Sequence, residues 1–142
     1  MKDMIDEIKT RLTDAGADIL GFADISSLPP EPRKDLPFAI SLGVALDPIV
    51  IRNIASGPTR EYYQEYLRTN RLLDSLARLT ENFLRERGFR AHGYAATDTG
   101  IDPKTHSVDL PHKTVATLAG LGWIGKCALL ITDEFGSAVR IT

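Results

Sequence analysis

Apolar residues recur along this chain with two spacings, one typical of helices and one typical of strands. Near the N-terminus they fall four positions apart, at Met4, Ile8 and Leu12, as on one face of an amphipathic helix. Short continuous apolar runs, such as residues 38–44, are typical of buried strands. The predicted helices span residues 2–15, 48–55, 60–87 and 111–119, and the predicted strands span 17–23, 38–44, 89–95, 128–132 and 138–141.

Capping and breaking residues set the limits of these elements. Asp47 followed by Pro48 predicts an N-cap with proline at the first helical position. Thr59 is placed to cap the longest helix, and Gly88 is placed to end it. Gly136 favours a hairpin between the last two strands.

The order of elements predicts a single α/β domain over residues 1–142. We expect a layered architecture, with a central mixed sheet and the helices packed on it. Residues 97–109 are polar and rich in turn formers, which predicts a loop of the kind that often carries function.

Composition excludes several classes of protein. The net charge of -2, without a basic block, gives no strong nucleic-acid signal. No apolar run approaches the ~20 residues of a membrane-spanning helix, and the helical charge pattern of the first residues is not that of a signal peptide. The single cysteine, Cys127, excludes an internal disulfide and a cysteine-only metal cluster, which favours a cytoplasmic protein.

A glycine-rich turn near the C-terminus satisfies two phosphate-binding patterns. Gly120, Gly122 and Gly125 spell GxGxxG, and the same turn with Lys126 spells GxxxxGK. Both patterns act where a strand leads into a helix, whose free N–H groups then face the phosphate. Here a helix leads in and a strand leaves, so helical carbonyl groups lie at the entrance. This order of elements disfavours phosphate, so a flavin- or nucleotide-binding turn is kept only as the alternative hypothesis.

The same turn carries groups suited to a flat ligand. Its glycines permit the close approach of a ligand or of another strand. Trp123 offers a face for stacking or, alternatively, a plug for the core, and Lys126 offers a cation for a phosphate or carboxylate.

Three residues at the start of the preceding helix are candidates for chemistry. Asp109 is either the N-cap of this helix or a general acid that delivers a proton to a reduced substrate. His112 and Lys113 open the helix, where the dipole lowers the affinity of a histidine for protons. His112 is therefore either a neutral donor to a ligand or a partly exposed residue of the cap region.

Residues 119–131 and 135–141, AGLGWIGKCALLI and FGSAVRI, resemble a segment close to AGLGWIGKNxLLIxxxFGSxVxL. That segment recurs in the N-terminal catalytic domain of the epoxyqueuosine reductase family. The layout upstream, with an opening helix, a strand, a proline-rich connection and a long helix, is similar to that domain.

The resemblance implies a cobalamin-binding module that is distantly related to nitroreductase-like folds. In complete family members a ferredoxin-like domain with two four-iron clusters follows, and the reduced corrinoid removes oxygen from an epoxide on a modified tRNA nucleoside. By resemblance, Asp109 is the catalytic proton donor. The residues assigned by resemblance to the cofactor are His112, Lys113, Gly120, Gly122, Trp123, Gly125 and Lys126.

Departures from the family pattern shape the remaining expectations. The cysteines that bind iron–sulfur clusters are absent, so we expect residues 1–142 to be the N-terminal part of a longer oxidoreductase that needs an electron donor. Cys127 replaces an asparagine, which suggests a divergent branch whose substrate is a small molecule or a modified nucleoside. The second alternative is a non-catalytic scaffold or dimerisation domain, expected to form a homodimer.

Overall fold

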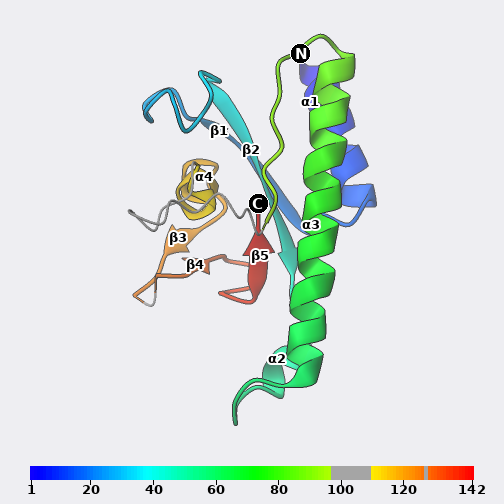
Figure 1. Ribbon diagram of the computed structural model, residues 1–142, viewed down its shortest axis with the longest axis vertical. Helices are drawn as coiled ribbons and strands as arrows, with labels where there is room; N and C mark the ends of the chain where they lie inside the picture. The colour runs from blue at the N-terminus through cyan, green and yellow to red at the C-terminus, as the bar shows by residue number, and fades with distance from the viewer. Residues whose placement is uncertain (97–109, 127) are drawn as a thin grey trace.

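The computed structural model describes residues 1–96, 110–126 and 128–142. Its elements are, in chain order, α1 (Lys2–Asp14), β1 (Ile19–Asp24), β2 (Phe38–Ala45), α2 (Pro48–Arg52), α3 (Arg60–Glu86), α4 (His112–Leu118), β3 (Trp123–Ile124), β4 (Leu130–Ile131) and β5 (Val139–Ile141). Helices α1 and α3 cover one face of the main sheet, and α4 with the small β3–β4 sheet lies over the other (Figure 1). The predicted layered α/β architecture is confirmed.

The main sheet has the strand order β1-β2-β5. Strand β1 pairs with β2 in a register that places Ile19 opposite Gly43, and β5 pairs with the end of β2, placing Ile141 opposite Gly43. Both pairings are antiparallel, whereas the sequence predicted a mixed sheet. Within the described residues no βαβ crossover joins neighbouring strands, and such a crossover is what a parallel pair would need.

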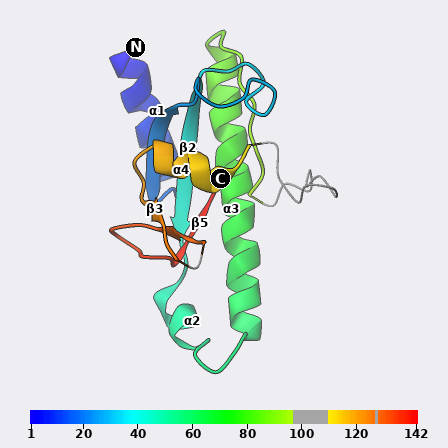
Figure 2. The ribbon, with the colours of Figure 1, turned by 90° about the vertical axis from the view of Figure 1, so that its left-hand side faces the viewer.

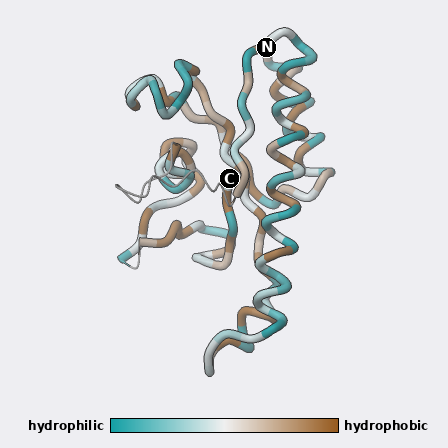
Figure 3. Tube along the Cα trace, viewed as in Figure 1, coloured by the Kyte–Doolittle hydropathy of each residue, from teal (hydrophilic) through white to brown (hydrophobic). Residues whose placement is uncertain are grey.

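The larger part of the core lies between this sheet and the helices α1 and α3. Even-numbered residues of β2, such as Leu42 and Val44, point toward the helices because side chains alternate along a strand. The helix residues buried against them are Ile8, Leu12, Leu73, Leu76 and Phe83. The alternation of apolar and polar colour along α3 in Figure 3 is that of an amphipathic helix.

Helix α4 packs closely on the opposite face of the sheet, as the turned view in Figure 2 also shows. The close approach depends on Gly21, where a Cβ atom would lie 2.7 Å from the carbonyl oxygen of Ala119. Ala116 is fully buried in this contact. Small residues on both elements therefore fix the position of the helix that precedes the glycine-rich turn.

Both predicted N-caps are confirmed. The Asp47 carboxylate accepts a hydrogen bond from the Ile49 N–H at 2.9 Å, and the Thr59 hydroxyl accepts one from the Tyr62 N–H at 3.1 Å. Helix α2 ends at Arg52 rather than at residue 55. Among the helices of the described ranges, none is long and apolar enough to cross a membrane.

The predicted strand over residues 89–95 is wrong. This segment runs beside α3 without joining a sheet, and carboxylates of α3 take the place of a neighbouring strand. The Gly93 N–H donates to Glu81 at 2.6 Å, and the Ala96 N–H donates to Asp74 at 2.9 Å. Its apolar run resembles that of a strand, but the Gly93 N–H and the following Ala96 N–H donate to side chains of α3 instead of to a strand.

The predicted hairpin between the last two strands is also wrong. Strand β4 pairs with β3, and β5 pairs with β2. Gly136 does form a tight turn, closed by two backbone hydrogen bonds with Thr132. The chain beyond this turn then joins the main sheet, where β5 completes pairing along the second half of β2.

Candidate functional site

The predicted site residues lie in two separate places around α4. His112, at the start of the helix, is half-buried, and its Nδ1 atom lies 3.5 Å from the carbonyl oxygen of Ile141. Its ring meets that of Tyr94 edge to face, with the ring centroids 6.4 Å apart. Tyr94 in turn meets His92 edge to face at 4.6 Å. These three rings, His92, Tyr94 and His112, are called the aromatic row.

A groove of about 950 Å³ opens beside the aromatic row. Its walls are mostly apolar side chains from α1, β1, β2 and α3, and all three rings of the row line it, together with Leu110 and Val115 near α4. A groove of this size and character falls in the range of pockets that bind small molecules and cofactors. The residues of the glycine-rich turn do not line it.

The edge of the groove carries a fixed negative charge at Asp24. The hydroxyl and the backbone N–H of Ser26 both donate to its carboxylate, and these bonds hold the pKa of Asp24 below its usual value, with Arg33 adding to the effect. The guanidinium of Arg33 donates to backbone carbonyls, including those of Leu28 and Leu36. It therefore orders the proline-rich connection that forms this rim.

The glycine-rich turn forms the second place. Its glycines are required by the backbone conformation and by packing within the protein itself. Gly120 ends the helix with a φ of +77°. A Cβ atom on Gly122 would lie 1.9 Å from the carbonyl oxygen of Ile131, and one on Gly125 would lie 2.9 Å from the Ile131 side chain. Strand β4 thus occupies the space that these glycines leave open.

Strands β3 and β4 form a small hairpin, and Lys113 connects α4 to the connection between its two strands. Its ammonium group donates to the carbonyl oxygen of Ala128 at 2.6 Å. Ala128 has a φ of +61°, a left-handed conformation that alanine rarely adopts, so this contact lies at a strained point of the turn. The Lys126 side chain is exposed on the same turn.

Trp123 lies on the surface and not in the core. Its side chain is 51% exposed, and the neighbouring Ile124 and Leu129 are exposed to a similar extent. The interpretation of Trp123 as a core plug is therefore wrong. A cluster of half-exposed apolar side chains on one hairpin is typical of a surface that meets a ligand or a partner.

The order of elements around the turn is the one that the sequence predicted. Helix α4 leads in, the short β3 lies within the turn and β4 follows it, so helical carbonyl groups, and not free N–H groups, lie at the entrance of the turn. This arrangement does not favour phosphate, and neither glycine pattern has its usual structural context.

Asp109 and Cys127 lie outside the described residues. Across the ranges that are described, no group of three or more acidic, histidine or cysteine side chains is placed to hold a metal ion. The assignment of residues to a cofactor or to proton transfer therefore stays a prediction.

Comparison with known proteins gives one solved structure to set beside this geometry. No family model matches the chain, and no curated protein matches its sequence. A crystal structure of epoxyqueuosine reductase with an epoxyqueuosine-modified tRNA-Tyr stem loop matches with a TM-score of 0.61 over 99% of this chain. The two chains share a fold. Their sequence identity is 20%, and the match spans 44% of the reductase, so this chain corresponds to less than half of that protein.

Sequence reasoning missed the groove and the aromatic row. The groove is built by elements that are far apart in the chain, and no single segment signals it. His92 and Tyr94 lie in residues 89–95, which the apolar pattern predicted as a strand. That pattern therefore gave no sign of their position at the groove.

Proposed function

We propose that this chain is the cobalamin-binding module of an iron–sulfur-dependent reductase that resembles epoxyqueuosine reductase. Three observations support the proposal: the residue pattern of the last thirty residues or so, the shared fold across the chain, and the exposure of Trp123. The last carries the most weight, because a tryptophan held at the surface by a glycine-packed hairpin is suited to contact a flat ligand.

The residues present fit a large ligand with apolar faces and polar edges, as a corrinoid is. We assign Trp123 and Lys126 to contact with the ligand. We assign His112, which lines the groove, to contact with the ligand from the groove side. Gly122 and Gly125 hold the hairpin in place, and Lys113 anchors its tip. When bound, reduced cobalamin would supply electrons for the removal of oxygen from a substrate.

The chain's own residues would hold the ligand and move a proton. Asp109 is the proposed proton donor, by resemblance to the family. With a single cysteine, the chain needs an electron donor from outside these residues, such as a ferredoxin-like domain with four-iron clusters. The structurally similar reductase was crystallised with a modified tRNA stem loop, which makes a modified nucleoside the first substrate to test.

The proposal is tested by anaerobic titration with cob(II)alamin, followed by absorption and by tryptophan fluorescence. Trp123 is the single tryptophan, so its emission reports on the hairpin alone. We expect saturable binding with a shifted cobalt spectrum. Trp123→Leu should weaken binding about fivefold, since an aromatic contact contributes on the order of 1 kcal/mol beyond its buried area.

The matched control is Tyr63→Leu, which removes another exposed aromatic side chain, near the start of α3. It should bind cobalamin as the unchanged protein does. No cobalt spectral shift, with the fold intact by circular dichroism, would overturn the proposal. Flavin or nucleotide binding in its place would favour the first alternative, and a stable dimer that binds neither ligand would favour the scaffold.

A further inference from the structure

Arg140, in β5, presents one edge of its guanidinium with no acceptor among the described residues. The opposite edge is occupied: Nε and Nη2 donate to the Asn70 side-chain oxygen at 3.2 and 3.0 Å. The central carbon of the guanidinium lies over the Tyr66 ring, 4.5 Å from its centroid. The group is therefore held in one orientation from two sides, with its Nη1–Nη2 edge left open.

Asn70 adds further donors beside this edge. The residue is 6% exposed, and its side-chain oxygen accepts from Arg140, which leaves the amide nitrogen of the same group as a donor. No described acceptor is within hydrogen-bond distance of that nitrogen. Among the described residues, the Ser41 hydroxyl is the only fully enclosed side-chain group that lacks a partner. The amide nitrogen of Asn70 is not in that class, and it is thus a donor that lacks a described partner and is not fully enclosed.

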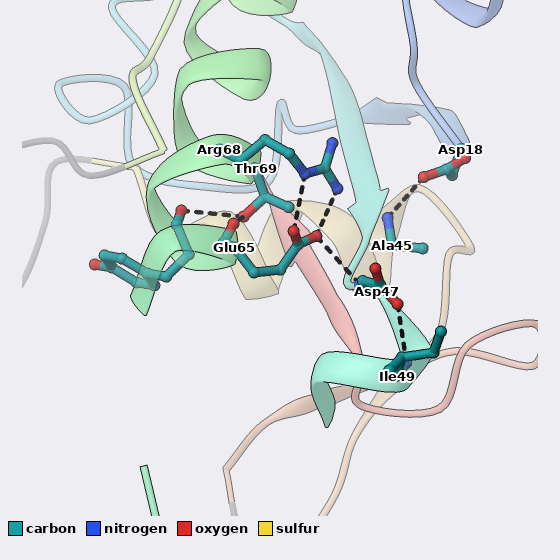
Figure 4. Close-up of polar contacts among 8 residues, drawn as sticks. Asp18, Ala45, Asp47, Ile49, Glu65, Arg68 and Thr69 are labelled. Atoms are coloured by element: carbon teal, nitrogen blue, oxygen red, sulfur yellow. Dashed lines mark hydrogen bonds and ion pairs between the residues drawn. The ribbon is translucent and has the colours of Figure 1, made fainter. Parts of the chain in front are cut away.

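The buried carboxylate of Glu65, on α3, is already matched by a cation. Glu65 accepts hydrogen bonds from Nε and Nη2 of Arg68, and one from the Asp47 N–H at 3.1 Å (Figure 4). The bond from Arg68 is the main reason that the pKa of Glu65 lies below its usual value. In the described part of the chain Arg140 makes no ion pair, so its positive charge is not neutralised.

We propose that Arg140 and Asn70 form a binding site for the phosphate group of a small ligand, which we call the β5 anion site. A guanidinium edge matches two oxygens of a phosphate at once, and the amide of Asn70 can donate to a third. Partial burial strengthens such bonds, because less water competes for the donors. The site is separate from the hairpin and from the groove, and it does not rest on the proposed cofactor.

The test is titration with inorganic phosphate, followed by the amide chemical shifts of β5 and α3 in the NMR spectrum. Two variants remove the site in different ways. Arg140→Gln removes the charge, and Asn70→Asp keeps an oxygen for Arg140 while replacing the N–H donors with a negative charge. Each should weaken phosphate binding at least tenfold. Arg140→Lys, which keeps the charge but loses the planar fork, should weaken it several-fold.

The matched control is Arg78→Gln, which removes an exposed arginine on α3 that has no described partner. It should leave phosphate binding unchanged. Equal losses in Arg78→Gln and Arg140→Gln would overturn the proposal in favour of general charge attraction, as would unweakened binding by Asn70→Asp. Acetate that competes at the same concentration as phosphate would overturn the assignment to phosphate. If Arg140→Gln does not fold, Asn70→Asp decides the outcome.

Discussion

Replacing Gly122 with alanine tests whether the hairpin itself demands glycine at this position. The added Cβ atom would lie 1.9 Å from the carbonyl oxygen of Ile131 and 2.9 Å from its carbonyl carbon. Both are backbone atoms of β4, so no side chain can swing aside to make room. Strand β3 must move away from β4, and this movement weakens the pairing that positions Trp123.

The expected loss of stability follows from this clash. Overpacking a well-packed region costs about 1–3 kcal/mol, and we expect the upper end, about 3 kcal/mol, because backbone has to move. Gly120→Ala is the matched control, since nothing lies within 4 Å of the added atom there. That change meets only the strain of a left-handed φ, about 1–2 kcal/mol.

Urea unfolding, followed by circular dichroism and by the emission of Trp123, measures both losses. Circular dichroism gives the global free energy of unfolding, and Trp123 emission detects a hairpin that opens locally before the rest. The reasoning is refuted if Gly122→Ala loses no more stability than Gly120→Ala and leaves Trp123 emission unchanged. The clash also means that the loss of cobalamin binding in a Gly122 variant would not by itself locate the ligand.

Three further changes test other parts of the structure. Ser41→Ala should raise the free energy of unfolding by up to about 1 kcal/mol, because its buried hydroxyl has no described partner. Thr132→Val should lower the free energy of unfolding by about 1–3 kcal/mol, because it removes the acceptor of the Phe135 N–H. Equal effects of the two changes in urea unfolding would contradict this contrast. Glu65 has a lowered pKa, so its ionised form stabilises the fold above the usual glutamate pKa, and this stability is lost as the pH falls through the lowered value. Glu65→Gln should therefore be less stable at neutral pH and lose less on acidification, and parallel pH curves of the thermal midpoint would disprove this. Ala128→Gly should raise the thermal midpoint, because glycine accepts a φ of +61° without strain; a lower midpoint would show that the turn tolerates alanine.

The sequence by itself determined the elements whose signals are local. The spacing of apolar residues and the caps at Asp47 and Thr59 predicted α1, α2 and α3, because periodicity and capping act within a few residues. The same is true of the helix that leads into the glycine-rich turn. The pattern around Trp123 indicated the fold that the solved reductase shares.

Tertiary structure decided how these elements pair and which side chains reach the surface. The partners of β4 and β5 depend on which sheet each strand meets after the Gly136 turn, and no local pattern specifies that meeting. Residues 89–95 have the apolar composition of a strand, but carboxylates of α3 accept the N–H groups of Gly93 and of the following Ala96. The exposure of Trp123, the groove and the donors around Arg140 likewise arise where distant segments meet, because burial and hydrogen-bond partners are properties of the packed chain.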